Sequence, residues 1–417
     1  MSDGPADEHK ANGVTDSELS DLRGLIAASE RDYLRDLEHL VDIDCGSYTK
    51  AGVDQVGRWV AAALTELGAS VEVDRNDDLG DTILGIWDGF DDGPRALLIG
   101  HMDTVFEPGT ATQRPYAVAD GRAMGPGVTD MKSGLLAGIY ALRAMRDLHA
   151  QRHGGGPDAA WLPFSRLVFI ANPDEEIGSP VSSPVIRRHA QDSDLTLVLE
   201  CARANGDIVS SRKGVADLHI VISGRAAHAG VEPHKGRSAV LEAAHKILAL
   251  HALNGRWPGV TVNAGVVQGG TRPNVVAENA TIKVDVRAVD RASMEQVEAD
   301  IERIGAHSTV PDVTAVIESH GRHWPMEKLA RSAVLFDHAV ALARRLGFEL
   351  QDAATGGASD ANTTAGMGIA TIDGLGPVGG GDHSPTEYLE LASVVPRVTL
   401  LAALLLATGR DDAIADW

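Results

Sequence analysis

Along the first half of the chain, apolar residues recur with the spacings of an α/β protein. Apolar positions three and four apart predict helices in "RDYLRDLEHLVDI" (31–43) and "VGRWVAAALTELGA" (56–69). Short apolar or alternating runs predict strands, namely "SVEVDR" (70–75), "TILGIW" (82–87), "RALLIG" (95–100), "RLVFIAN" (166–172) and "DLTLVLE" (194–200). Between the third and fourth of these runs, "RAMGPGVTDMKSGLLAGIYALRAM" (122–145) indicates a Gly-Pro-Gly loop followed by a helix.

The pattern changes at about residue 213. Strand and helix signals follow in the order strand, helix, strand, strand, helix, strand, in "GVADLHIVISG", "SAVLEAAHKILALHAL", "GVTVNAGVVQGG", "NATIKVDVRAV", residues 291–305 and "DVTAVIES". This order indicates an α+β, ferredoxin-like unit. After "HGRHWPMEK" the α/β pattern returns. We therefore expect a disordered tail over 1–20, a larger α/β domain formed by 21–212 and 326–417, and an inserted domain over 213–325.

Composition and charge narrow the classes of partner. The formal net charge of -22 predicts a chain that avoids nucleic acid and anionic membranes. Two cysteines, Cys45 and Cys201, give no disulfide framework and suit a reducing compartment. The polar, acidic N-terminus lacks the parts of a signal peptide, and "VTLLAALLLA" (398–407) is too short to span a bilayer, which predicts a buried helix. We expect a cytoplasmic protein.

Three of the predicted strands end in residues that can bind metal ions. His101 follows "RALLIG", the pair Glu175 and Glu176 follows "RLVFIAN", and Glu200 ends "DLTLVLE". In open α/β sheets, ligands bind beyond the carboxyl ends of the strands. We therefore expect these side chains to converge.

Each signal also has an ordinary interpretation. In "HMDTV", His101 and Asp103 lie two apart and face the same side, so Asp103 could accept a hydrogen bond from the histidine ring; a chance His-x-Asp in a loop is the alternative. Asp130 lies where a glycine-rich loop becomes a helix, and an aspartate there is most often an N-cap. His383 follows the glycine run "GPVGGG", in a loop that could equally be a plain surface feature.

The adjacent carboxylates of Asp174, Glu175 and Glu176 form a further signal, for which a solvated acidic turn is by itself the favoured interpretation. Carboxylates this close need a cation or must take up protons, unless they form a solvated acidic turn. Two of them could divide the work, one binding metal while its neighbour acts as a base. The apolar strand immediately before them weakens the interpretation as a solvated turn.

Together these positions supply nitrogen and oxygen ligands for zinc, without cysteine, which favours a catalytic over a structural site. The candidate ligands are His101, Asp130, Glu176, Glu200 and His383, with Glu175 spare. One bridging carboxylate and two terminal ligands per ion would form a two-metal centre.

The ordered motifs extend this interpretation. They are "HMDTV", "GPGVTDMKSG", "NPDEEIGS", "VLE", "GRAAHAG", "GGTRPNVV", "VDVRA", "GGASDAN" and "GDHSPTEYLE". Over about residues 30–408 the chain resembles the co-catalytic zinc peptidases and amidohydrolases, a family that includes glutamate carboxypeptidase, acetylornithine deacetylase, succinyl-diaminopimelate desuccinylase and aminoacylase. The resemblance implies a mixed-sheet catalytic domain and an inserted domain that acts in dimerisation or as a lid.

The resemblance also implies a role for each metal-site residue. Asp130 would bridge two Zn2+ ions, with Co2+ or Mn2+ as substitutes. His101 and Glu200 would hold one ion, and Glu176 and His383 the other. Glu175 would be the general base, and Asp103 would orient His101. A cis peptide bond is expected between Asp130 and Met131.

In the inserted domain, the resemblance implies that His228 reaches the active site of a partner subunit and steadies the oxyanion. Asn274 and Arg287 would bind the substrate carboxylate, for which the planar fork of arginine is suited. A surface ion pair is an equal alternative for Arg287. Gly357 would offer backbone contacts to the substrate. A homodimer through the inserted domain is expected, although a monomer with a simple lid is the alternative.

The expected activity is hydrolysis of the amide bond in an N-acyl amino acid or small peptide that has a free C-terminal carboxylate. An aminoacylase, dipeptidase, deacetylase or desuccinylase of the same family is an alternative that the motifs do not separate. A catalytically silent binding protein is the alternative from another class. It predicts the loss of a ligand or of the base, and all six of these positions are filled.

Overall fold

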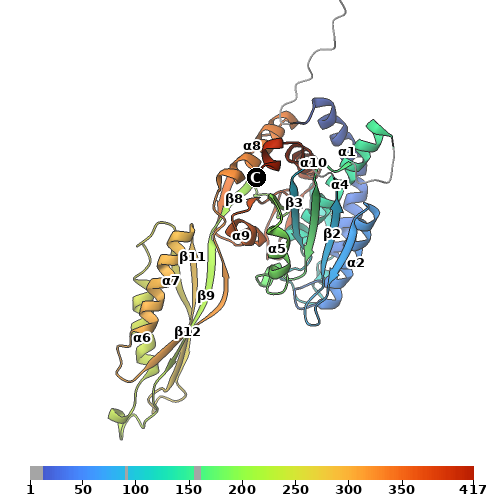
Figure 1. Ribbon diagram of the computed structural model, residues 1–417. Coiled ribbons are helices and arrows are strands. Elements are labelled where there is room, and N and C mark those ends of the chain that lie inside the picture. Colours follow the sequence, from blue (N-terminus) through green and yellow to red (C-terminus); the bar gives the residue numbers. More distant parts are fainter. Residues whose placement is uncertain (1–12, 90–92, 155–160) are drawn as a thin grey trace, which may run out of the picture. The chain divides into compact units, whose positions relative to one another are not determined.

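The computed structural model describes residues 13–89, 93–154 and 161–417 (Figure 1). The chain divides into two compact units. Unit 1 comprises the chain up to Ser210, then Lys328–Ala354 and Ser359–Trp417. Unit 2 comprises Ser211–Glu327 and Thr355–Ala358. Each unit has its own cluster of buried apolar side chains, so each is described by itself.

A mixed β-sheet runs through unit 1. Within the described residues its strand order is β1-β2-β6-β3-β7-β14. The strands are β1 (Ser70–Asp74), β2 (Thr82–Asp88), β3 (Arg95–His101), β6 (Arg166–Asn172), β7 (Leu195–Val198) and β14 (Ala370–Ile372). β1 and β2 join the sheet antiparallel, whereas β6, β3, β7 and β14 run parallel. The predicted α/β fold with a mixed sheet is confirmed.

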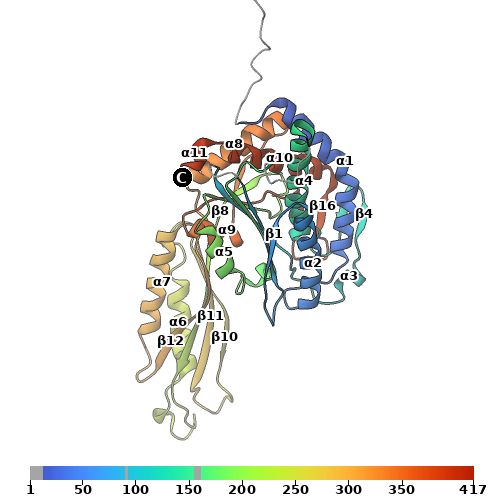
Figure 2. The ribbon, with the colours of Figure 1, turned by 45° about the vertical axis from the view of Figure 1, so that its right-hand side comes forward.

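Helices pack beside this sheet. The two views in Figures 1 and 2 show α1 (Asp16–Val41), α4 (Ser133–His153) and α10 (Val394–Gly409) together, and these three helices contact one another. The other helices of unit 1 are α2 (Lys50–Glu66), α3 (Thr110–Gln113), α5 (Ser183–Ala190), α8 (Ala330–Leu346), α9 (Asp360–Gly366) and α11 (Asp412–Ala415).

The apolar run at 398–407 forms part of α10, and every residue of this run is buried. Leu391–Gly409 is the one segment of the described chain that is long and apolar enough to cross a membrane, and 72% of its apolar window lies inside the protein. The predicted buried helix is confirmed.

The N-terminus corrects one expectation. We expected disorder over 1–20, but α1 begins at Asp16. Thr15 and Glu18 form a capping box, in which each side chain accepts a hydrogen bond from the other residue's backbone N–H. This box satisfies donors that the first helical turn leaves open, so the helix starts earlier than its apolar pattern alone indicates. Residues 1–12 lie outside the described residues.

Unit 2 is an antiparallel sheet with two helices, and its described strands lie in the order β10-β11-β9-β12. Its elements are β9 (Gly214–Ser223), α6 (Ala239–His251), β10 (Thr261–Gly269), β11 (Asn279–Ala288), α7 (Arg291–Ala306) and β12 (Thr314–His323). Alternate β9 residues such as Ile220 and Ile222 are buried in the core of unit 2, whereas those between them are partly or fully exposed. This is the predicted ferredoxin-like order.

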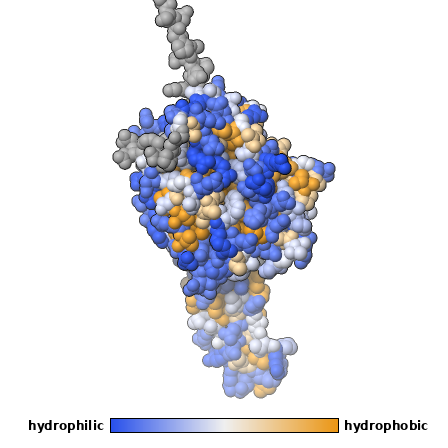
Figure 3. All heavy atoms as spheres, turned by 90° about the vertical axis from the view of Figure 1, so that its right-hand side faces the viewer, coloured by the Kyte–Doolittle hydropathy of each residue, from blue (hydrophilic) through white to orange (hydrophobic). Residues whose placement is uncertain are grey.

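Smaller sheets complete the structure. One consists of β15 (Gly379–Gly380), β16 (Tyr388–Glu390), β5 (Arg122–Met124) and β4 (Ala117–Ala119), and β8 (Ile208–Arg212) pairs with β13 (Asp352–Thr355). The face seen in Figure 3 is largely hydrophilic, with small separate hydrophobic patches. Such a surface agrees with the net charge of -22.

Candidate functional site

The candidate site lies in unit 1, where parallel strands end at one edge of the sheet. β3 ends at His101, which pairs in register with Asn172, the last residue of β6. β7 lies on the other side of β3, and Glu200 follows its last residue by two positions. The predicted convergence of strand ends is therefore confirmed, and the reason is the parallel register.

Asp130 comes from an irregular turn before α4. The bond between Asp130 and Met131 is cis, as expected. The N-cap of α4 is Lys132, so Asp130 does not have the capping role that its position alone favours. Instead its carboxylate lies between two imidazoles: Oδ1 is 3.1 Å from Nε2 of His101, and Oδ2 is 3.2 Å from Nε2 of His383.

The remaining predicted ligands surround this carboxylate. Oε2 of Glu176 is 2.9 Å from Nε2 of His383, and Oε1 of Glu200 is 3.7 Å from Nε2 of His101. Two ligands held about 2.0–2.1 Å from a tetrahedral zinc ion stand about 3.3 Å apart. The observed separations are thus those of donors that can share an ion, and the five residues fit a metal centre with Asp130 in the middle.

Glu175 lies at the same place but contacts a different part of the cluster. One of its carboxylate oxygens lies within 4.8 Å of a ligand atom of His101 and of Glu200. In a second group, ligand atoms of His101, Asp130 and Glu176 lie within 4.8 Å of one another. Burial and the neighbouring Glu200 carboxylate raise the pKa of Glu175 well above its ordinary value. A carboxylate with a raised pKa is a stronger proton acceptor.

The three adjacent carboxylates have three different surroundings. Asp174 is fully buried and its Oδ2 accepts hydrogen bonds from the backbone N–H of Val181 (2.6 Å) and Ser182 (3.3 Å), so it shapes the turn rather than the site. Glu175 and Glu176 both point to the cluster. The interpretation as a solvated acidic turn is therefore wrong, because the turn is folded against the end of the sheet.

Asp103 links the histidine to the glutamate pair. Its carboxylate accepts hydrogen bonds from the backbone N–H of Glu175 and of Glu176, each 3.2 Å, and from the hydroxyl of Ser47 at 2.6 Å. Nδ1 of His101 lies 3.0 Å from the backbone oxygen of Asp103 and 3.3 Å from its Oδ1. Asp103 thus contacts the ring of His101 through its backbone oxygen and its carboxylate, and it also holds the acidic turn.

Sequence reasoning missed the residue that fixes the turn of Asp130. The side chain of Glu387 is buried, and it accepts hydrogen bonds from the backbone N–H of Gly127 (2.9 Å), Thr129 (2.9 Å) and Asp130 (3.1 Å). The one available signal was its place in "GDHSPTEYLE", four residues after His383. No local pattern indicates that a glutamate there holds a distant loop.

The charges at the site call for a cation. Burial disfavours ionisation of Asp130, yet hydrogen bonds from His101 and His383 hold its pKa well below its ordinary value. Hydrogen bonds from Asp130 and Glu176 raise the pKa of His383 to about 11. Burial lowers the pKa of His101, but the carboxylates of Glu200 and Asp103 outweigh it and raise that pKa well above its usual value. Protons on the two imidazoles therefore offset only part of the carboxylate charge in the metal-free protein, and a bound cation would take their place.

The other predicted site residues belong to unit 2. His228 forms an isolated antiparallel bridge with Val275, and the backbone N–H of Ala229 donates to the oxygen of Asn274 at 3.0 Å, so two candidate residues lie on adjoining loops. Nδ1 of His228 accepts a hydrogen bond from Gly230 N–H at 3.2 Å. This bond leaves the ring proton on Nε2, which makes Nε2 a donor.

Arg287 has partners of its own within unit 2. Its Nε lies 3.0 Å and its Nη2 3.2 Å from the two carboxylate oxygens of Asp285, and its Nη1 donates to the backbone oxygen of Gly356 at 2.7 Å. Gly357, the next residue, is exposed. Arg287 thus forms the surface ion pair that was its alternative interpretation, beside the loop that carries Gly357.

Comparison with known proteins identifies the family. Residues 97–407 match the sequence profile of peptidase family M20/M25/M40. The chain is 28% identical over 383 residues to carboxypeptidase G2 of Pseudomonas sp. (strain RS-16), covering 90% of this chain and 89% of that protein. It is 25% identical over 395 residues to the uncharacterised protein YqjE of Bacillus subtilis (strain 168), covering 90% of this chain and 98% of that protein.

The fold resembles the crystal structure of aminopeptidase PepT from Bacillus cereus, with a TM-score of 0.73 and 23% identity over 91% of this chain and 99% of that one. The family profile spans more than half of the chain, and the residues that the fold gathers at the sheet edge form groups that could hold a metal ion. The chain therefore belongs to peptidase family M20/M25/M40, a family of metal-dependent hydrolases.

Proposed function

We propose that this chain is a zinc-dependent hydrolase that cleaves the amide bond of an N-acyl amino acid or small peptide with a free C-terminal carboxylate. The observation that carries the proposal is Asp130, whose two oxygens each contact a different histidine. A carboxylate in that position suits a bridge between two ions. The similarity to carboxypeptidase G2 supports the class of substrate.

The residues would hold two ions in two sets. His101 and Glu200 would bind one, His383 and Glu176 the other, and Asp130 both. Divalent ions bound there supply Lewis-acid chemistry, since they polarise a carbonyl and bring the pKa of water towards neutrality. Glu175 also lies close to His101 and Glu200 and could bind the first ion. We assign Glu175 to proton transfer instead, because the other five residues already supply the ligands of both ions.

Glu175 would move one proton through the reaction. Its carboxylate takes a proton from the water whose oxygen attacks the substrate carbonyl. It then gives that proton to the nitrogen that departs as the C–N bond breaks, so the carboxylate is regenerated. Glu175 is suited to both steps because its carboxylate lies beside His101 and Glu200 without being needed as a ligand. Asp103 would position Glu175 through the backbone N–H that it accepts.

Charge counting supports a substrate with a carboxylate and a separate cation to bind it. Asp130, Glu176 and Glu200 carry three negative charges against the four positive charges of two zinc ions. With an anionic nucleophile the centre is near neutral, so a substrate carboxylate needs a cation elsewhere. We assign that role to Arg287, with Asn274 and the backbone at Gly357, and Arg287 would exchange its contact with Asp285 for the substrate.

His228 would steady the oxyanion through its Nε2 donor, from a partner subunit of a homodimer formed through the inserted domain. This domain would also act as a lid over the substrate. We place the enzyme in the cytoplasm, on the grounds of its acidic, cysteine-poor composition.

The proposal is tested by a hydrolysis screen over acyl groups and C-terminal amino acids, with and without a chelator. An N-acyl glutamate should be cleaved, its α-amide should be a poor substrate, and the chelator should stop both reactions. Glu175→Gln should lower kcat by about 10²–10⁴-fold with unchanged zinc content. Glu390→Gln, a change at a partly exposed side chain on β16, is the matched control and should behave as wild type. A fully active Glu175→Gln enzyme would refute the base, and chelator-resistant turnover would refute the metal centre.

A further inference from the structure

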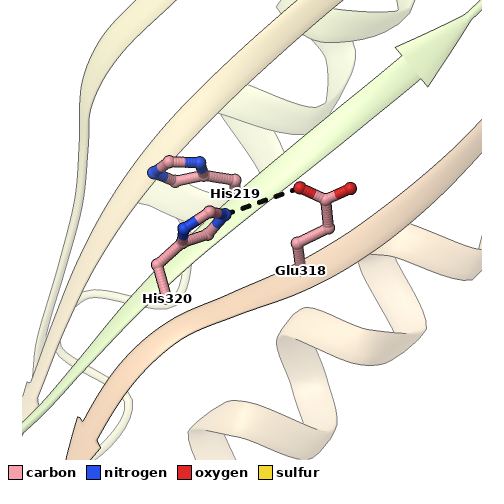
Figure 4. Close-up of side chains that lie close together, drawn as sticks. All are labelled: His219, Glu318 and His320. Atoms are coloured by element: carbon pink, nitrogen blue, oxygen red, sulfur yellow. Dashed lines mark ion pairs between the residues drawn. The ribbon is translucent and has the colours of Figure 1, made fainter. Parts of the chain in front are cut away.

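A second group of metal-binding side chains lies in unit 2, on residues that the proposed catalytic centre does not use. His219 is on β9, and Glu318 and His320 are on β12 (Figure 4). One ligand atom from each lies within 4.8 Å of the other two. On β9, His219 alternates with the buried residues Leu218 and Ile220, so its side chain is on the face of the sheet away from the core of unit 2.

The two histidine rings lie face to face. Their centroids are 3.6 Å apart, with an angle of 28° between the ring planes. Nε2 of His320 is 3.5 Å from Oε2 of Glu318, close to the separation of about 3.3 Å expected of two ligands on a tetrahedral ion. The side chains of Glu318 and His320 are 53% and 43% exposed, so they can turn without displacing a neighbour in the core.

The backbone fixes where these side chains begin. Glu318 is the direct cross-strand partner of His219. The register between β9 and β12 then shifts between Ser319 and Gly321, and His320 is the extra residue of this β-bulge. A bulge re-aims a side chain, and here the extra residue places its ring against that of His219. Three donors thus converge from two neighbouring strands rather than from loops.

The donor set selects a class of ion. Two imidazole nitrogens and one carboxylate oxygen suit Zn2+ and similar transition-metal ions, and they leave a fourth position for water. Asp217, two residues before His219 on β9, has its Oδ1 3.7 Å from Nε2 of His219, so it adds negative charge beside that ring without a hydrogen bond to it. One feature opposes a cation: Lys283 on β11 is the cross-strand partner of His219.

We propose that His219, Glu318 and His320 form a second Zn2+-binding site, which clamps β12 to β9. β12 is the last strand in the order of its sheet, so it has a neighbour on one side among the described strands. Its ladder is interrupted at the bulge. An ion held jointly by β9 and β12 stabilises the pairing at this interruption, because it binds the paired state and not the separated one.

The test measures zinc per chain in the full-length protein, dialysed at fixed free Zn2+ high enough to saturate the catalytic centre. Wild type should hold one zinc ion more than H219A/H320A, and hydrolytic activity should be the same in both. H245A/H251A, which removes two exposed histidines of α6, is the matched control and should keep the wild-type zinc content.

Two further variants and one local measurement complete the test. Glu318→Gln should weaken the additional zinc about tenfold, and Lys283→Gln should tighten it about three- to tenfold by removing a nearby positive charge. Amide hydrogen exchange of β12 should slow on addition of Zn2+ in wild type and stay unchanged in H219A/H320A. Equal zinc content in wild type and H219A/H320A overturns the site, as does an equal loss in H245A/H251A. Additional zinc without slower exchange of β12 overturns the clamp.

Discussion

The buried carboxylate of Glu387 provides the sharpest test of how the site is positioned. Its Oε1 accepts the backbone N–H of Thr129 and of Asp130, and its Oε2 accepts that of Gly127. Glu387→Gln keeps the shape of the side chain. The amide oxygen can still accept two of these bonds, but the amide NH2 then faces the third N–H, so a donor meets a donor.

The magnitude follows from that loss. A hydrogen bond to a charged group contributes about 1.5–3 kcal/mol, and the turn of Asp130 loses at least one such bond. Because zinc binding requires the turn to be in place, the loss should appear in the metal affinity. It corresponds to about a 10- to 150-fold rise in the Kd for zinc. kcat/KM should fall at limiting zinc and recover in part at saturating zinc.

The assay is competition between the protein and a chromophoric chelator for Zn2+ at a fixed pH well above 7, because burial raises the pKa of Glu387 to about 7 and the carboxylate must be charged. Glu390→Gln is the control, since Glu390 is three residues away on β16 and forms an exposed ion pair with Arg122, with 2.7 Å between Nη2 and Oε1. Such pairs contribute about 0–1 kcal/mol, so the control should bind zinc as wild type does. Wild-type affinity in Glu387→Gln would refute the view that Glu387 holds the bridging ligand in place.

Four further predictions concern the site and the packing of α4 in unit 1. The carboxylate partners of His383 raise its pKa to about 11, so zinc must displace a proton from its ring when it binds. Metal uptake in weak buffer should therefore release protons, and His383→Ala should release about one proton fewer than wild type. Zinc affinity should also rise with pH from about 6.5 to 11. The ion pairs of His383 with its carboxylate partners should stabilise the metal-free protein fully below about pH 6.5, and this stabilisation should be lost as the pH rises to about 11. A free energy of unfolding that does not change with pH over that range would contradict this. Gly134→Ala should destabilise unit 1 by at least about 2 kcal/mol in denaturant unfolding, because its Cβ would lie 1.9 Å from the backbone oxygen of Leu199; a wild-type midpoint would mean that α4 shifts freely. Ser47→Ala removes the 2.6 Å hydrogen bond to Asp103 and should cost about 1.5–3 kcal/mol in stability, with Ser47→Thr as the variant that keeps the hydroxyl.

Much of the fold could be predicted because periodicity is a local property of the chain. The apolar runs of β3, β6 and β7 each span seven residues or fewer, and the candidate metal ligands lie at or just after their ends. The capping box of Thr15 and Glu18 is also local, in "TDSE", and it corrects the expected disorder of the first helical turn. The sequence thus determined which segments are strands and which ligands lie at their ends.

Only the tertiary structure decided which side chains meet. It set His101 and His383 on the two oxygens of Asp130, and it brought Glu387 to the turn that carries this aspartate. Likewise, the alternation of β9 predicts the face on which His219 lies, but not that a bulge in β12 presents His320 to it. The physical reason is that the alternation of side chains along one strand determines only the face to which each side chain points. Which strands are neighbours, their register and their bulges depend on hydrogen bonds between segments far apart in the chain.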